Sequence, residues 1–148
     1  MVIPLGDAMP FRLILVAIFF LILDQFTKML VTCRLAAGQS VIIASWIRIR
    51  HVANARVWWL PHQPRVLLFV WAGLFSGISL IVWQGYFFQH RAAQLGLGMA
   101  LGGAGSNIVD QLRHGAVMDF LDLGWWPVFN LADVAITIGV ITALWFLY

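Results

Sequence analysis

The composition of this chain indicates that lipid, rather than water, is its natural solvent. Its 148 residues are 62% hydrophobic and only 10% charged, with a mean hydropathy of +0.91. A soluble domain of this size needs a more polar surface. The nine basic residues are scattered, without a basic stripe or a nucleic-acid motif, so we expect no nucleic acid as a partner. The length suits one domain, and we predict a single unit over residues 1–148.

Four apolar segments have the length that a membrane-spanning helix needs, which is about 20 residues. We predict spans over residues 11–32, 66–88, 92–112 and 131–148. Four spans place both termini on one side of the membrane and the connecting segments 34–65 and 113–130 on the other. The single cysteine, Cys33, excludes an internal disulfide and argues against a metal cluster.

The segment after the first span has a different pattern. It begins with an alternating, β-branched run, QSVIIASWIRIRHV, which predicts one or two short strands. Pro61 and Pro64 end this pattern before the second span. The segment also carries five arginines, namely Arg34, Arg48, Arg50, Arg56 and Arg65. A count of basic residues alone would therefore make it cytoplasmic.

The third predicted span is rich in small residues. Gly98 and Gly102 form a GxxxG pair, and Ala104 extends the same small face. Such a face lets two helices approach closely in a membrane, so we predict that it is a packing surface.

Polar and ionisable side chains gather where the spans meet the connecting segments. The first span ends with Asp24, Gln25, Thr27 and Lys28, and the third ends with Asn107, Asp110 and Gln111. Asn130 and Asp133 begin the fourth, and Asp119 lies just before it. A charge at membrane depth costs a few kcal/mol unless it is paired, so each of these residues is a candidate for function.

Structural roles compete with this interpretation for most of these residues. Asp24 and Lys28 are four residues apart and can form an ion pair on one helix. Asn107 and Asp110 can bond to backbone groups where the third helix ends. Asn130 suits a helix N-cap, and Asp133 suits the positive end of the same helix.

Asp119 lacks such an explanation, because it lies between Met118 and Phe120 with no capping pattern around it. The sequence predicts an irregular stretch there. If Asp119 and Asp133 met, their like charges would raise one pKa, and the pair would share a proton. One carboxylate could then activate water while the other protonates a peptide group. This is aspartyl protease chemistry, which needs no metal, no nucleophilic serine and no cofactor.

Four blocks of the sequence carry a resemblance to a known family. They are DQFTK at 24–28, GGAGSNIVD at 102–110, GAVMDF at 115–120 and FNLADVAITIG at 129–139. In this order, on four predicted spans, they resemble lipoprotein signal peptidase, or signal peptidase II. The resemblance implies an all-α membrane protein of four transmembrane helices with a small extracytoplasmic β-rich cradle, here over about 34–65.

The same resemblance implies roles for individual residues. The catalytic dyad would be Asp119 and Asp133. Substrate binding and support of the site would involve Asn54, Asn107, Asp110, Asn130, Asp24 and Lys28, with no metal. Trp125 and Trp126 would lie at the membrane interface near the cleft.

The family's activity implies the partners and the location. Its members cut prolipoproteins just before a cysteine that carries diacylglycerol, so we expect a lipid-modified prolipoprotein substrate and contact with membrane lipids. The expected location is the bacterial inner membrane, crossed several times, with the active site facing the periplasm, against the arginine count. Two alternatives stay open: a non-catalytic relative that packs or assembles a larger complex with partner membrane subunits, and an unrelated four-helix binding or transport protein.

Three departures from the family pattern fall around the expected site. The cradle block N-x-G-A-A-[FW] reads NARVWW over 54–59, so Arg56 replaces the glycine and Trp58 replaces a small residue. Gln111 stands where the family usually has arginine, which removes a charged donor. Asp119 and Asp133 are 14 residues apart, fewer than is usual in the family, so we expect an altered lid over the site.

Overall fold

The computed structural model describes residues 9–54, 73, 77 and 90–147. Within these ranges the chain forms three helices and three strands. The helices are α1 (Met9–Arg34), α3 (Arg91–His114) and α4 (Leu131–Trp145), and the strands are β1 (Ser40–Ala44), β2 (Ile47–Asn54) and β3 (Val117–Asp122). The predicted second span, 66–88, lies almost wholly outside the described residues, as does the part of the predicted cradle after Asn54.

Helix α1 contains the predicted first span and has the character of a membrane-crossing helix. Its portion Phe11–Arg34 is long and apolar enough to cross a bilayer, and only 11% of its most apolar stretch is buried inside the protein. Large apolar side chains such as Ile14, Phe19 and Ile22 are exposed along it. An exposed apolar helix surface of this length is suited to lipid.

Helix α3 contains the predicted third span and packs between α1 and α4. A methyl group at Gly98 would lie 2.8 Å from Cβ of Val16, and one at Gly102 would overlap the backbone of Ala17. On the other face, a methyl group at Gly103 would lie 2.5 Å from the carbonyl oxygen of Ala132. The prediction that Gly98 and Gly102 form a packing surface is confirmed, and a second small face serves α4.

Helix α4 is shorter than the predicted fourth span of 131–148. It has 15 residues and ends at Trp145, with Phe146 as its C-cap. The helix begins directly after its N-cap, Asn130, as the capping pattern predicts. At 1.5 Å per residue it is about 22 Å long.

The strands form one antiparallel sheet in the order β1-β2-β3. The predicted strands in the segment after α1 are confirmed as β1 and β2. The prediction of an irregular stretch around Asp119 is wrong, because this residue lies in β3, opposite Val52 of β2. Asp119 and Asp122 interrupt the apolar residues of this segment, so its sequence shows no clear strand pattern. Its strand conformation depends instead on pairing with β2, which is distant along the chain.

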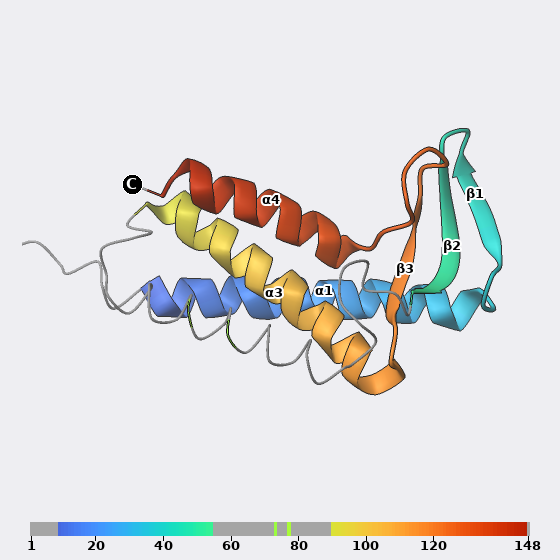
Figure 1. Ribbon diagram of the computed structural model, residues 1–148, viewed down its shortest axis with the longest axis horizontal. Coiled ribbons are helices and arrows are strands. Elements are labelled where there is room, and N and C mark those ends of the chain that lie inside the picture. The colour runs from blue at the N-terminus through green and yellow to red at the C-terminus, as the bar shows by residue number, and fades with distance from the viewer. Residues whose placement is uncertain (1–8, 55–72, 74–76, 78–89, 148) are drawn as a thin grey trace, which may run out of the picture.

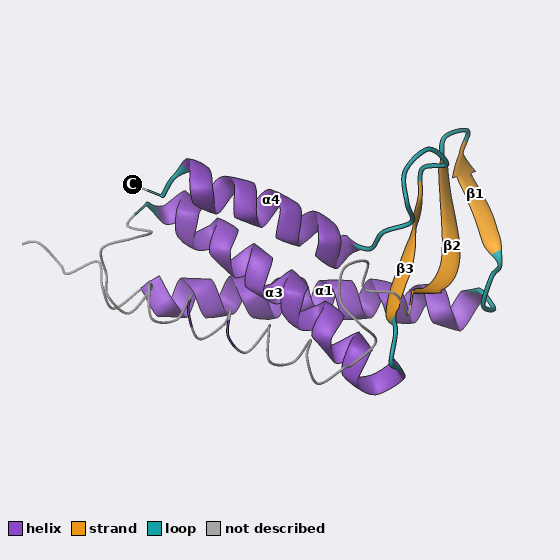
Figure 2. Ribbon diagram, viewed as in Figure 1, coloured by secondary structure: helices purple, strands orange, loops and turns teal. Residues whose placement is uncertain are grey.

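The three strands gather at one end of the helices, as Figures 1 and 2 show. Strand β3 is the nearest to the helices, and the last described residues lie at the opposite end of the molecule (Figure 1). The C-terminal ends of α1 and α3 and the N-terminal end of α4 therefore meet beside the sheet. This is the end at which the polar residues singled out in the sequence come together.

Candidate active site

The start of α4 places Asp133. Asn130 is the N-cap, and its side-chain oxygen accepts a hydrogen bond from the backbone N–H of Asp133 at 2.9 Å. In return, Oδ2 of Asp133 accepts from the backbone N–H of Asn130 at 3.2 Å. This reciprocal capping box is the structural role that the sequence predicts. It leaves Oδ1 of Asp133 for a different partner, Nδ2 of Asn107 on α3, at 2.9 Å.

Strand β3 places Asp119, whose side chain is almost fully buried, with 5% of its surface exposed. Oδ1 accepts a hydrogen bond from Nδ2 of Asn130 at 2.9 Å, and Oδ2 accepts from Nδ2 of Asn54, the last residue of β2, at 3.1 Å. The register of β2 against β3 therefore decides which side chains reach this carboxylate.

Asn130 joins the two aspartates. Its side chain is fully buried, with its oxygen on the backbone of Asp133 and its nitrogen on the carboxylate of Asp119. The same nitrogen donates to Oδ1 of Asn107 at 3.1 Å, and Nδ2 of Asn107 in turn donates to Oδ1 of Asp133. Asn107 and Asn130 thus hold both carboxylates in one network, and all four residues were singled out from the sequence.

A buried ionic cluster lies behind this network. Nζ of Lys28 is 2.6 Å from Oδ2 of Asp24 and 2.6 Å from Oδ2 of Asp110, and it donates to Oδ1 of Asn107 at 3.0 Å. The predicted ion pair of Asp24 and Lys28 is confirmed. Because Lys28 has no acceptor atoms, its contact fixes the oxygen of Asn107 on this side and turns the amide nitrogen toward Asp133.

The cluster also ties separate elements together. Oδ1 of Asp24 accepts from the backbone N–H of Ala132 at 2.8 Å, so α1 contacts the first turn of α4. Oδ2 of Asp110 accepts from the backbone N–H of Met118 at 3.2 Å, so α3 contacts the strand next to Asp119. The supporting role of Asp24 and Asp110 remains a prediction. Their hydrogen bonds connect α1 and α3 to the two elements that carry Asp133 and Asp119.

Two supporting residues escape the sequence-based list of site residues. Ser106 is fully buried and donates to Oδ2 of Asp24 at 2.6 Å, and Gln25 donates to Oδ1 of Asp110 at 2.7 Å. Ser106 follows a run of glycines and reads as one more small packing residue. Gln25 is among the polar residues that the sequence places at the end of the first span, next to Asp24 in the DQFTK block, but it was given no role in the site.

The environment of Asp119 favours its protonated form. The pKa of this carboxyl is raised to about 6, mainly by burial and also by the negative charge of Asp133, while the hydrogen bonds from Asn54 and Asn130 lower it. A carboxyl with this pKa can hold or release a proton near neutral pH. Among the described residues, no group of three or more His, Cys, Asp or Glu side chains could hold a metal ion.

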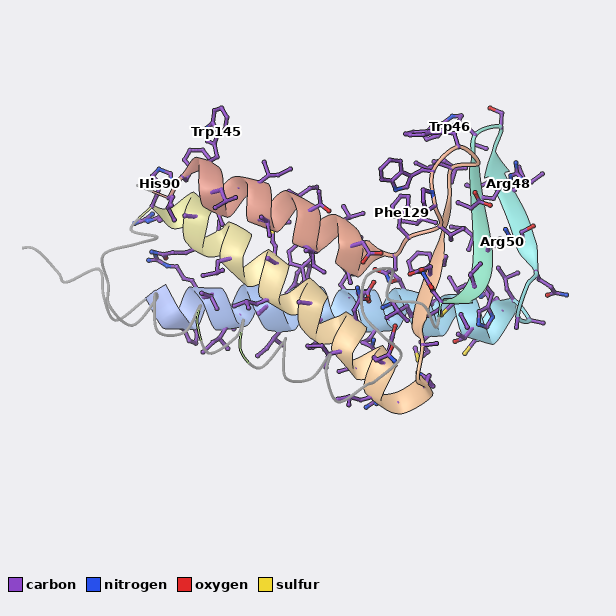
Figure 3. All side chains as sticks on the ribbon, in the orientation of Figure 1. Trp46, Arg48, Arg50, His90, Phe129 and Trp145 are labelled. Carbon is purple, nitrogen blue, oxygen red and sulfur yellow. The ribbon has the colours of Figure 1, made fainter. Side chains whose placement is uncertain are left out.

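The loop between β3 and α4 accounts for the short spacing of the two aspartates. Phe129 pairs with Leu121 through two backbone hydrogen bonds, of 2.8 and 3.1 Å, and Oδ1 of Asp122 accepts from the N–H of Gly124 at 2.8 Å. Figure 3 shows Phe129 between the sheet and the start of α4. A closed turn of this kind leaves Trp125 and Trp126 exposed at its tip.

The departures from the family pattern have different structural settings. Gln111 donates to the carbonyl oxygen of Gly115 at 3.1 Å, so it closes the end of α3 rather than contacting either aspartate. Gly115 has a φ of 67°, the left-handed conformation that glycine adopts readily after a helix. Arg56 and Trp58 lie outside the described residues.

Comparison with known proteins identifies the family. The family described as Signal peptidase (SPase) II matches residues 16–148. The chain belongs to the signal peptidase II family. It is 36% identical to the lipoprotein signal peptidase of Moorella thermoacetica over 93% of this chain and 91% of that protein. It is likewise 36% identical to the lipoprotein signal peptidase of Pelotomaculum thermopropionicum, over 91% of this chain and 90% of that protein.

The fold agrees with that of solved membrane enzymes. A bacterial membrane enzyme determined at 1.9 Å resolution superimposes with a TM-score of 0.80 and 25% identity, over 89% of each chain. A second such structure, at 2.3 Å, gives a TM-score of 0.80 with 26% identity. The protein is therefore a membrane-bound signal peptidase II family member with a helical body and a small sheet, and the resemblance inferred from its four sequence blocks is confirmed.

Proposed function

We propose that this protein cleaves the signal peptide from lipid-modified prolipoproteins, with Asp119 and Asp133 as its catalytic dyad. Membership of a family of aspartic endopeptidases supports the reaction class. The observation that carries the residue assignment is the network in which Asn130 and Asn107 hold both carboxylates together at the end of the helices.

In the proposed reaction the dyad shares one proton, which Asp119 holds. Asp133 accepts a proton from water as the water oxygen bonds to the scissile carbonyl carbon, and Asp119 donates its proton to the carbonyl oxygen. As the carbon–nitrogen bond breaks, the proton on Asp133 passes to the leaving amine, while a hydroxyl proton of the intermediate returns to Asp119. The hydrogen bonds from Asn54, Asn107 and Asn130 keep both carboxyl groups oriented throughout.

We further propose four membrane-spanning helices in a single unit over 1–148, with the sheet and the dyad on the periplasmic side of the bacterial inner membrane. Helix α1 supports this arrangement by its length and apolar surface. The exposed Trp46 lies at the sheet (Figure 3), and the exposed Trp125 and Trp126 lie in the loop that follows β3. Amphipathic rings of this kind suit the membrane interface. Arg48 and Arg50 of β2 (Figure 3) then lie on this side as well, although a count of basic residues alone would place them in the cytoplasm.

The test is cleavage of a diacylglyceryl-modified prolipoprotein by the purified protein in detergent. We expect cleavage by the wild type and loss of at least about a thousandfold in rate for Asp119→Asn and Asp133→Asn, because each substitution removes one proton carrier. The matched control is Asp122→Asn, which changes a buried carboxylate of the same strand outside the dyad.

Retained cleavage in either dyad variant would overturn the residue assignment. Absence of cleavage by a folded wild type would overturn the proposed function and favour a non-catalytic subunit, which copurification of partner chains would then identify.

A further inference from the structure

A cavity of about 850 Å³ lies next to the dyad network but is separate from it. It opens where the end of α1, the end of α3 and the strands β2 and β3 meet. Lys28 and Asp110 lie in its wall, whereas Asp119, Asn130 and Asp133 do not. Its volume is within the range of cavities that bind small molecules.

The wall of the cavity is largely apolar on the side of the helices. Leu21, Ile22, Phe26 and Met29 of α1 and Val109 of α3 contribute to it. Ile22, Phe26 and Met29 are also among the exposed large apolar side chains of α1. The cavity is therefore continuous with the surface of the helix that faces lipid, and an acyl chain could enter it without leaving an apolar environment.

The side of the cavity toward the connecting segments is basic. Arg113 and His114 in the last turn of α3 and His51 of β2 line it. Within the described part of the chain, neither Arg113 nor His114 forms an ion pair. The ring of His51 is held by a contact of 2.8 Å from Nδ1 to the carbonyl oxygen of Leu35, which leaves Nε2 as its second polar atom.

The other charged side chains in the wall, Lys28 and Asp110, belong to the buried cluster, in which Lys28 also pairs with Asp24. Lys28 and Asp110 pair with each other at 2.6 Å, and Asp110 also accepts from Gln25 and from the backbone of Met118. The unpaired charge that a ligand meets is thus positive. An apolar half joined to a basic half, at the depth where helices leave the membrane, is complementary to an acyl chain joined to a phosphate.

We propose that this cavity binds one anionic phospholipid, with an acyl chain along α1 and Val109 and its phosphate on Arg113, His114 and His51. The proposal rests on the membrane location of the protein, not on its peptidase activity. The site differs from the proposed substrate site, since a diacylglyceryl cysteine carries no phosphate and the cleaved peptide bond must reach the dyad.

The test uses the full-length protein, delipidated in a neutral detergent, and counts bound lipids by native mass spectrometry. Phosphatidylglycerol and phosphatidylcholine with identical acyl chains are titrated separately. We expect one phosphatidylglycerol per protein, bound at least about tenfold more tightly than phosphatidylcholine. The double variant Arg113→Gln/His114→Gln should lose this preference at unchanged thermal stability.

The matched control is Arg48→Gln/Arg50→Gln, which removes two exposed basic side chains of β2 that do not line the cavity. This variant should bind phosphatidylglycerol as the wild type does. Equal binding of the two lipids by the wild type, or equal loss in both double variants, would overturn the proposal.

Two further outcomes identify another occupant. Binding of inorganic phosphate alone, with an affinity equal to that of the lipid, would mean that the acyl chain contributes nothing. A raised KM for the prolipoprotein in Arg113→Gln/His114→Gln, measured without phospholipid, would mean that the basic side of the cavity contacts the substrate instead. Either result would overturn the assignment to a phospholipid.

Discussion

Asp119 is a buried carboxyl whose neighbours act on its charge in opposite directions. Burial and the charge of Asp133 favour the protonated form, and the amides of Asn54 and Asn130 favour the ionised form. The first pair prevails, which raises the pKa to about 6. An acid of this strength suits a site that must hold a proton in one step and give it up in another.

This pKa makes the stability of the protein depend on pH. The unfolded carboxyl ionises near 3.8 and the folded one near 6, so between these values the folded state binds more protons and stability falls as pH rises. Asp119→Asn removes this penalty. The quantity to compare is the free energy of unfolding of the variant minus that of the wild type. We expect this difference to be more positive at pH 7.5 than at pH 4, by on the order of 1–3 kcal/mol.

Thermal melting in detergent, followed by tryptophan fluorescence at both pH values, measures the difference. Asp122→Asn serves as the control, because it makes the same chemical change at another buried carboxylate of β3. A stability difference between Asp119→Asn and the wild type that does not change with pH would contradict the raised pKa.

Lys28 is the positive centre of a buried cluster, and its removal leaves charges without a partner. Lys28→Met would bury the carboxylates of Asp24 and Asp110 uncompensated, at an expected cost of about 3–5 kcal/mol. Arg34→Met, an exposed change on the same helix, should stay within about 0.5 kcal/mol. Denaturation in detergent compares the two variants, and similar losses in both would show that the cluster contributes no more than a surface charge.

At the scale of elements, α3 is held by two glycine faces. Gly102 has no space for a side chain against Ala17 of α1, whereas a methyl group at Gly105 would meet only the end of Leu21 at 3.3 Å. Gly102→Ala should therefore cost about 1–3 kcal/mol, and Gly105→Ala less than about 1 kcal/mol. Both variants make the same chemical change, so melting temperatures that fall equally would contradict the packing described for Gly102.

The sequence allows α1, α3 and the start of α4 to be predicted because local patterns define them. Length and hydropathy indicate the helices, and Asn130 with Asp133 has the spacing of a capping box. Strand β3 could not be found in this way. Its pattern is broken by Asp119 and Asp122, and its order depends on pairing with β2, which is far away along the chain.

The candidate site was predictable to a similar extent. The residues named from the four sequence blocks do meet, since they sit at ends of elements that the fold brings together. The cavity beside the site was not predictable, because it depends on four separate elements. Ser106 was missed because it directly follows the small-residue run 102–105 and looks like a continuation of that packing surface.

At the scale of the whole molecule, the single cysteine offers a test of orientation. Cys33 is exposed at the end of α1 that lies beside the sheet. If this end is periplasmic, a membrane-impermeant maleimide added to intact spheroplasts should modify Cys33. In Cys33→Ser/Arg91→Cys the only thiol moves to the opposite end of α3, and we expect labelling only after permeabilisation.

Labelling of both variants in intact cells would indicate leakage, and the reverse pattern would show that the sheet faces the cytoplasm. That result would agree with the count of arginines and would contradict the proposed orientation.

The capping box at the start of α4 makes one hydrogen-bond pattern serve two purposes. Asn130 and Asp133 begin the helix, and the same two side chains join the carboxylates of the site. A copy in which α4 begins one residue early or late turns Asp133 away from Asn107. Newly inserted or misassembled copies would therefore lack peptidase activity. This protein would begin to cleave other membrane proteins only after its own folding is complete.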